Sequence, residues 1–354
     1  MCRFSYTACE IFSCELDEVY TTLLEDESLM ALLFSLLDKP APLNSNPAGY
    51  FGRVVGSLLG KRPEKTHEYL QRHKELLPKL VTHIDSTSTV EVLLRMTGAD
   101  EVISSMAPPN TSDWLADTNL MQLFLEQLCK EVPSSKHARL QQEAAQRNVA
   151  HIMVMLAGAQ PKSPLVDQLT EREYLRTMLD HASRPNSSVL RPILSVCIAL
   201  LEPTRAPPMV PGGMSWGLMP GSGDAESSDP HTNVDMTTVR AAAAEITEYL
   251  DRFTQLLTEP GHVAMQAQPF GMLKPPLGRH RLVVVEFGKA LLSTGLPMAI
   301  QAVVESNFVP MVMQLFEVPI SSTMPHSYQS SASFLADSSV LITPKISYFD
   351  YLKR

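Results

Sequence analysis

Apolar side chains recur at intervals of three and four residues along most of this chain, and this spacing constrains the fold more than any other feature. The pattern places apolar residues on one face of an α-helix, whereas a β-strand would alternate with a period of two. In residues 235–258 the stripe joins Val239, Ile246, Leu250, Phe253 and Leu257. Aromatic residues make up only 6% of the chain, while Leu, Met and Ala are plentiful, which favours helix over sheet. We therefore predict an all-α fold.

Similar stripes predict further helices. They assign one helix each to residues 9–24, 63–72, 120–128, 164–181 and 187–201. Residues 28–37 are so apolar that we expect them to be buried on most sides. The β-branched run 283–285 suits a strand by propensity, but Val284, Gly288 and Leu291 share a helical face, and we predict helix there.

Capping and turn residues mark several helix ends. Pro47 suits the first turn of a helix capped by Ser45 or Asn46. The segment from Ser88 to Glu91 has the spacing of a capping box, and Gly98 would stop that helix. Helices of about 10–25 residues joined by short turns are typical of an α-solenoid or an irregular bundle. No repeat is regular enough to give a period.

One stretch interrupts the helical pattern. Residues 202–234 hold six Pro and five Gly and lack an apolar stripe, which predicts a flexible loop or linker. The tail is Ser-rich and aperiodic, so we expect it to be disordered. We predict four segments: a helical region at 1–201, the linker at 202–234, a helical continuation at 235–318 and the divergent tail at 319–354.

Charge and cysteine content exclude several classes of protein. The net charge of −9 argues against a general nucleic-acid binder, which would need a basic face. The five Cys residues are sparse and contain no CxxC pair, so we expect reduced thiols and a cytoplasmic, possibly also nuclear, location. The longest nearly uncharged run, 187–201, is too short to span a bilayer and is broken by Arg191 and Pro192.

Two glycine-containing motifs fail the tests of their chemistry. Residues 213–217 match the nucleophile-elbow string GxSxG around Ser215, but no strand precedes them in the Pro/Gly-rich stretch. Gly52, Gly56 and Gly60 precede Lys61 without the spacing of a phosphate-binding loop. Their four-residue spacing instead places them on one helix face, where small residues allow a second helix to approach closely.

The histidines also lack the spacing of a metal site. His67 and His73 resemble HExxH, but six residues separate them, so they face away from each other on a helix. His137, His151 and His181 are isolated, and we interpret them as ordinary surface or packing residues. We therefore predict no catalytic, metal-binding or cofactor-binding residues, and no cofactor.

Two other features have more than one interpretation. The acidic run Glu25-Asp26-Glu27 precedes a predicted helix, where acidic residues offset the helix dipole. An acidic contact patch for a partner is the alternative for the same residues. Trp114 is interpreted as a packing anchor, although exposed Trp residues are also favoured in interface hot spots.

Several segments, taken in order, resemble the SAPS domain of regulatory subunits of protein phosphatase 6-type enzymes. The resemblance lies in the opening run Ala8–Leu16 with the helices that follow it, in Val90–Met96, in Trp114–Leu120, in Gln142–Ala145 and in Pro276–Val285. Together the matching stretches cover about 1–160 and 275–316. Relative to the family pattern the chain starts late and diverges after Phe316, so we expect it to be truncated at both ends.

The resemblance implies an armadillo- or HEAT-like helical-repeat scaffold. Such a subunit would bind the catalytic subunit of a Ser/Thr phosphatase and direct its choice of substrate, with no catalytic residue of its own. Further scaffold proteins are possible partners. The resemblance does not indicate which residues contact the phosphatase.

Two other hypotheses stay open. A generic helical-repeat adaptor would share the fold and lack the phosphatase partner. A hydrolase using Ser215 would need a preceding strand and a nearby His-Asp pair, and the sequence suggests neither.

Overall fold

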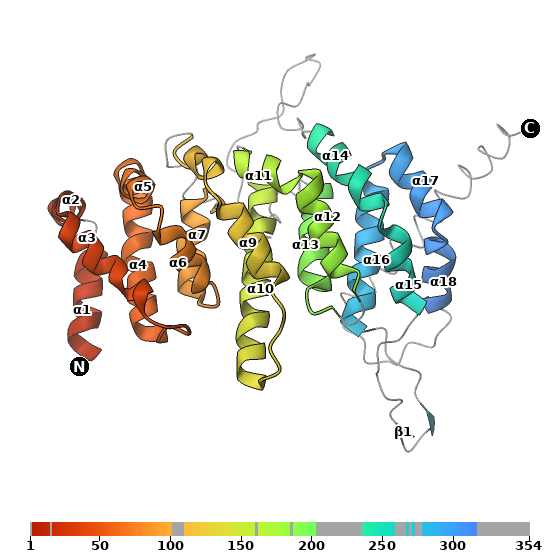
Figure 1. Cartoon of the computed structure of the whole chain (residues 1–354), viewed down its shortest axis with the longest axis horizontal. Helices are drawn as coiled ribbons and strands as arrows, with labels where there is room; N and C mark the ends of the chain where they lie inside the picture. Colours follow the sequence, from red (N-terminus) through yellow and green to blue (C-terminus); the bar gives the residue numbers. More distant parts are fainter. Residues whose placement is uncertain are drawn as a thin grey trace, which may run out of the picture. The chain divides into compact units, whose positions relative to one another are not determined.

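In the computed structural model the described part of the chain is almost entirely helical (Figure 1). The structure describes residues 2–14, 16–100, 110–159, 162–184, 187–202, 236–258, 267–268, 271–272 and 278–316. Two short strands, β1 (Ala267–Gln268) and β2 (Gly271–Met272), form an antiparallel pair. The all-α prediction is confirmed.

The chain divides into two compact units, Met1–Ile246 and Thr247–Arg354. The first unit contains α1 (Cys2–Phe12), α2 (Asp17–Glu25), α3 (Glu27–Phe34), the 3₁₀ helix η1 (Ser35–Asp38), α4 (Ser45–Lys61), α5 (Pro63–Arg72), α6 (Leu76–Thr82), α7 (Thr87–Met96), η2 (Asp113–Asp117), α9 (Leu120–Cys129), α10 (Lys136–Gly158), α11 (Pro164–Leu169), α12 (Arg172–Ala182), α13 (Leu190–Leu201) and nearly all of α14 (Met236–Thr247). The second unit contains α15 (Leu250–Thr258), α16 (Gly278–Ser293), α17 (Pro297–Glu305) and α18 (Phe308–Phe316).

A row of helices forms the spine of the first unit. Helix α1 packs on α4, α4 on α7, α7 on α10 and α10 on α13, and Figure 1 shows these helices following one another in chain order. Helices of a second row also contact one another, with α2 on α5, α6 on α9 and α9 on α12. Each spine helix with the helices before the next one makes a repeat, as in an armadillo- or HEAT-type solenoid.

The repeat has an irregular length. The spine helices begin at residues 2, 45, 87, 136 and 190, so the intervals are 43, 42, 49 and 54 residues. The first intervals lie in or near the range of about 40–47 residues that is typical of HEAT and armadillo repeats. Because the later intervals are longer, the sequence has no fixed period.

Small residues set the distance between α4 and α7. A Cβ atom on Gly52 would lie 2.9 Å from Ser88 Cβ and 3.0 Å from the Ser88 carbonyl oxygen. A Cβ atom on Gly56 would meet the guanidinium group of Arg95. Both glycines are buried within α4, which confirms the helix-packing interpretation and excludes a phosphate loop there.

In the second unit, aromatic rings fill the space between helices. Phe253 and Phe287 meet edge to face with ring centroids 5.5 Å apart. A Cβ atom on Gly288 would collide with the ring of Phe308, which is fully buried. The helical interpretation of residues 283–285 is confirmed, because they lie within α16 and are buried.

Residues 9–24 are not one helix, which corrects the prediction. Helix α1 ends at Phe12, and α2 begins at Asp17 after the extended residue Leu16. The Ser13 hydroxyl donates to the Cys9 carbonyl at 2.8 Å, and the Ser13 N–H bonds to the Cys9 and Glu10 carbonyls. Side-chain bonds of this kind compete with helix propagation, while the apolar stripe continues in phase across the break.

Two other predicted helices are also divided. Residues 164–181 form α11 and α12, separated where the Thr170 hydroxyl donates to the Asp167 carbonyl and Glu171 is extended. Residues 235–258 form α14 and α15, with a turn at 248–249. In both segments the apolar residues of the sequence pattern lie on the buried faces of the helices. The pattern does not indicate the turn between the two helices.

The caps differ from prediction by one or two residues. Asn44, and neither Ser45 nor Asn46, caps α4, because its side-chain oxygen accepts from the Asn46 N–H at 3.1 Å. Helix α7 already begins at Thr87, so Ser88 does not form the predicted capping box. The stop at Gly98 is confirmed: its φ is +72°, and the Ala99 N–H bonds back to the Leu94 carbonyl at 2.9 Å.

Three predictions lie outside the described residues. They concern the linker at 202–234 beyond its first residue, the tail at 319–354 and the motif around Ser215. They stay predictions.

Candidate functional site

His67 and His73 have separate partners, as their spacing predicts. His67 is buried in α5, and its Nδ1 accepts a hydrogen bond from Trp114 Nε1 at 3.0 Å. Desolvation lowers the pKa of His67 to about 4, so the ring is neutral at pH 7. Trp114 is half-buried and links η2 to α5, which fits its interpretation as a packing anchor.

His73 follows α5 and lies between two carboxylates. Its Nε2 is 3.0 Å from Glu27 Oε1, and its Nδ1 is 3.0 Å from Glu75 Oε1. Hydrogen bonds to Glu27 and then Glu75 raise the pKa of His73. The pKa values of His67 in α5 and of His73 just after it are therefore shifted in opposite directions.

The other candidate groups stay apart. His137 and His151 are exposed on α10, and His181 is half-buried on α12. In the part of the chain that the structure describes, no three His, Cys, Asp or Glu side chains gather as a metal site would require. The structure therefore directs attention to surfaces that bind partners.

A series of ion pairs joins the first repeat to the second. Glu10 pairs with Arg53, Asp17 with Arg62 at 2.6 Å, Glu27 with Arg72 at 3.6 Å, and Asp38 with Lys79 at 2.6 Å. The partners are 43, 45, 45 and 41 residues apart, close to one repeat. Exposed pairs of this kind each contribute only about 0–1 kcal/mol. We therefore interpret these ion pairs as aligning the first repeat with the second, with only a small contribution to the stability of the fold.

The acidic run Glu25-Asp26-Glu27 has a capping role at its centre. The Asp26 carboxylate accepts from the Ser28 N–H at 2.9 Å and from the Ser28 hydroxyl at 2.6 Å, which lowers the pKa of Asp26. Asp26 is therefore the N-cap of α3. The alternative of an acidic contact patch applies to Glu25, which is exposed at the end of α2.

A buried amide closes the carboxyl end of α9. Gln146 Nε2 donates to the Leu128 carbonyl at 3.1 Å and to the Lys130 carbonyl at 2.9 Å, and Gln146 is 1% exposed. Its Oε1 accepts from the Ser188 hydroxyl. One side chain of α10 thus satisfies backbone groups that α9 leaves free at its end.

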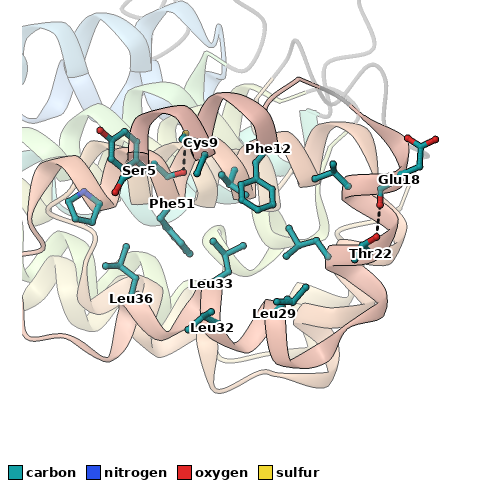
Figure 2. A pocket seen from close by; sticks show the side chains of 16 residues that line it. Ser5, Cys9, Phe12, Glu18, Thr22, Leu29, Leu32, Leu33, Leu36 and Phe51 are labelled. Atoms are coloured by element: carbon teal, nitrogen blue, oxygen red, sulfur yellow. Dashed lines mark hydrogen bonds between the residues drawn. The ribbon is translucent and has the colours of Figure 1, made fainter. Parts of the chain in front are cut away.

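An apolar groove of about 720 Å³ lies among α1, α2, α3, η1 and α4 (Figure 2). Its wall along α1 consists of Ser5, Ala8, Cys9 and Phe12. The opposite wall, along α3 and η1, consists of Leu29, Leu32, Leu33 and Leu36. The α4 side consists of Pro47, Tyr50, Phe51 and Val54. In each wall the residues follow the spacing i, i+3, i+4, i+7, which places them on one face of their helix. Three such faces therefore line the groove.

One end of the groove is polar. Glu18 and Thr22 of α2 stand there, with the Thr22 hydroxyl donating to the Glu18 carbonyl at 2.8 Å (Figure 2). Apart from these two residues and Ser5, the lining side chains are apolar or, like Cys9 and Tyr50, only weakly polar. Such a surface suits the apolar face of another helix.

The groove shows that one prediction is wrong. Residues 28–37 are not buried on most sides: Leu32 is 70% exposed and Leu29 is 37% exposed. Met30, Phe34 and Leu37 form the buried face instead. A helix that is apolar all round is either buried or presents a second apolar face, and the sequence pattern alone does not separate the two. The i, i+3, i+7 spacing of Leu29, Leu32 and Leu36 is the signal that could have indicated the second face.

The stacked repeats define a helical-repeat protein, a class whose extended surfaces suit contacts with other proteins. The chain belongs to the SAPS family, described as SIT4 phosphatase-associated protein, and the family match covers residues 55–314. The resemblance in the sequence is thereby confirmed.

Several curated proteins are similar over most of the chain. Serine/threonine-protein phosphatase 6 regulatory subunit 3-A of Xenopus laevis is 24% identical over 325 residues, which are 89% of this chain and 36% of that protein. Regulatory subunit 1 of Mus musculus is 26% identical over 297 residues, 82% of this chain and 34% of that protein. Extragenic suppressor of kinetochore protein 1 of Schizosaccharomyces pombe is 25% identical over 299 residues, 82% of this chain and 34% of that protein. The chain thus spans about a third of the length of these relatives.

Within the described ranges, no helix combines the length and the apolar character needed to cross a bilayer.

Proposed function

We propose that this chain is a regulatory and scaffold subunit that binds the catalytic subunit of a protein phosphatase 6-type Ser/Thr phosphatase and directs its substrate choice. The SAPS family match over residues 55–314 carries the proposal, and the names of the relatives support it. The helical-repeat fold suits the role, because stacked repeats offer extended surfaces to large partners.

The chain acts in this proposal without catalysing a reaction. Support comes from the relatives, which are named as regulatory subunits of a phosphatase. Binding would rest on a few buried anchors within a broad interface rather than on one reactive side chain. Further scaffold proteins would use surfaces that the phosphatase leaves free.

A binding experiment with purified proteins tests the proposal. The 354-residue chain is immobilised and mixed with a purified phosphatase 6-type catalytic subunit, and Ser215→Ala serves as the matched variant. Both forms should retain the subunit. Dephosphorylation of a phosphopeptide should need the catalytic subunit and change in rate when the chain is added.

Each other outcome has a defined meaning. If the well-folded chain does not retain the catalytic subunit, the proposal is rejected for this chain. The alternative hypothesis, a helical-repeat adaptor with no phosphatase partner, would then remain. Phosphatase or hydrolase activity of the chain alone, lost in Ser215→Ala, would reject the non-enzymatic role.

The proposal also includes a cytoplasmic location, with the nucleus as a second compartment. The sparse cysteines support it, because Cys9, Cys14, Cys129 and Cys197 are free thiols. Imaging of the tagged chain in cells, with a secretory marker as reference, would test this location. Overlap with the secretory marker would reject it.

A further inference from the structure

We propose that the groove among α1, α2, α3 and α4 binds an amphipathic helix of a partner protein that carries basic residues beside its apolar stripe. The proposal stands on the groove itself and does not depend on the phosphatase. Shape, exposure and charge in the groove support it.

The shape of the groove matches one helix. The α1 wall runs from Ser5 to Phe12 and the wall along α3 and η1 from Leu29 to Leu36, so each is eight residues long. The seven steps between its ends correspond to about 10 Å of α-helix, or two turns. Between two such walls, the open space fits a third helix whose apolar side chains recur at i, i+3, i+4 and i+7.

The exposed residues at the groove indicate that it is used. Leu32, exposed by 70%, and Leu29, exposed by 37%, belong to the lining, and both leave apolar surface open to solvent among the described residues. Docking would remove apolar surface from water, and each Å² removed contributes about 25 cal/mol to the free energy of binding. This burial is the main favourable contribution. A patch of exposed and half-buried leucines that lines a groove is typical of an interaction site rather than of a free surface.

The charges next to the groove select the partner. Between residues 4 and 54 the described residues carry seven carboxylates and two basic side chains. Glu10, Asp17, Glu27 and Asp38 pair with bases of the second repeat, and Asp26 caps α3. Among the described residues, Glu18 and Glu25 have no basic partner.

One of these carboxylates, Glu18, lines the groove, and Glu25 lies beyond the lining on the same face of α2. Glu18, Thr22 and Glu25 follow the spacing i, i+4, i+7 on α2, and Glu18 and Thr22 line the groove. An acidic edge attracts basic residues that flank an apolar stripe and repels acidic ones. It also repels an anionic membrane surface, so a basic amphipathic helix of a protein fits better than a lipid.

The test uses synthetic helices and the whole chain. One fluorescein-labelled peptide of about 14 residues has Leu at i, i+3, i+4 and i+7 and Lys beside that stripe; its counterpart has Glu in place of Lys. Fluorescence anisotropy should show the Lys peptide binding at least about ten-fold more tightly than the Glu peptide, a difference of about 1.4 kcal/mol. Equal binding of the two peptides, or none, would overturn the proposal.

Matched variants locate the contact. Leu32→Asp should weaken binding of the Lys peptide at least about ten-fold, whereas Leu140→Asp should not, because Leu140 is 55% exposed on α10 away from the groove. The double change Glu18→Gln and Glu25→Gln should remove most of the preference for Lys over Glu. All of these side chains are exposed, so the helical circular dichroism and the unfolding midpoint should stay unchanged.

Two outcomes would point to other occupants. If Leu140→Asp weakens binding as much as Leu32→Asp, the peptide does not sit in the groove and the proposal fails. If the unmodified chain forms dimers in sedimentation that Leu32→Asp abolishes, the occupant is a second copy of the chain, which would also overturn it.

Discussion

At the scale of single residues, the side chains with the clearest consequences are buried polar groups that satisfy backbone or ring atoms. None belongs to a catalytic motif. His67 was recognisable in the sequence as unsuited to a metal site, but its hydrogen bond to Trp114 was not, because 47 residues separate the two. A contact over that distance depends on how the repeats stack, which local patterns do not encode.

His67 should make the fold sensitive to acid. The pKa of His67 is about 4 when folded and about 6.5 when unfolded, so between these values the unfolded chain binds more protons. Stability should therefore fall as the pH falls from 6.5 towards 4, by about 2 kcal/mol at pH 5. Urea unfolding at pH 7 and pH 5 measures this loss. His67→Gln can still accept from Trp114 and should lose less stability on acidification.

His73 should respond with the opposite sign. Its pKa is raised in the folded chain by Glu27 and Glu75, so its contribution is fully present below pH 6.5 and is lost as the pH rises through the raised pKa. His73→Gln should therefore destabilise the chain more at pH 5.5 than at pH 8.5. An equal effect at both pH values would contradict the ion-paired state of this ring.

Gln146 should be needed for stability. Gln146→Met keeps a similar side-chain volume but leaves the Leu128 and Lys130 carbonyls without their donor. Loss of donors to buried carbonyls costs about 1–3 kcal/mol. The control is Gln122→Met, because Gln122 is exposed on α9 and bonds only to Glu126. If both variants show equal urea midpoints, Gln146 has no structural role.

At the scale of helices, the sequence predicts where helices exist better than where they end. The start of α5 at Pro63 and the stop at Gly98 just after α7 follow from Pro and Gly, whose backbone preferences are strong. The breaks at 13–16 and at 170–171 were missed because Ser13 and Thr170 act through their hydroxyl groups. Such residues also occur inside helices, so their presence alone predicts no break.

The contact between α4 and α7 gives a matched pair of glycine substitutions. Gly52→Ala places a methyl group against Ser88, including its backbone, and should destabilise the chain by about 1–3 kcal/mol. Gly49→Ala lies in the same helix with no atom within 4 Å of the new methyl group, and should stabilise by up to about 1 kcal/mol. Opposite shifts of the thermal midpoint are expected, and equal shifts would contradict this packing.

Gly56→Leu should be milder than Gly52→Leu in the same assay. The group that Gly56 faces is the end of the Arg95 side chain, which can move, whereas Gly52 faces backbone. The structure therefore makes Gly52 the sharper probe of this helix contact. Reversal of the order would mean that Arg95 is held rigidly.

At the scale of the whole molecule, the all-α class was predictable and the repeat was not. Apolar stripes record which face of each helix is buried, and they indicated helix throughout. Intervals of 43, 42, 49 and 54 residues between spine helices hide any period. The groove was also missed, because an exposed leucine row and a buried one look alike in sequence.

Stacked repeats should open unequally. Among the described residues, the main contacts of α1 and α2 outside their own repeat are with α4 and α5 on one side, whereas α10 packs against α7 on one side and α13 on the other. In a repeat protein the stability of each unit depends on its neighbours. Native-state hydrogen exchange of this chain should show lower opening free energies for α1 to α3 than for α10. Equal protection would indicate one cooperative unit.

Two ion pairs of Glu245 affect how well the chain should tolerate an insertion before α14. Glu245 of α14 is 14% exposed in its side chain and holds Arg172 and Arg176 of α12, with both Nε atoms 2.9 Å from its oxygens. These bonds dock α14 independently of the residues that connect it to α13. Doubling the length of a flexible connection costs only about 0.6 kcal/mol of closure entropy. A reporter domain inserted between residues 203 and 235 should therefore leave the docking of α14 intact.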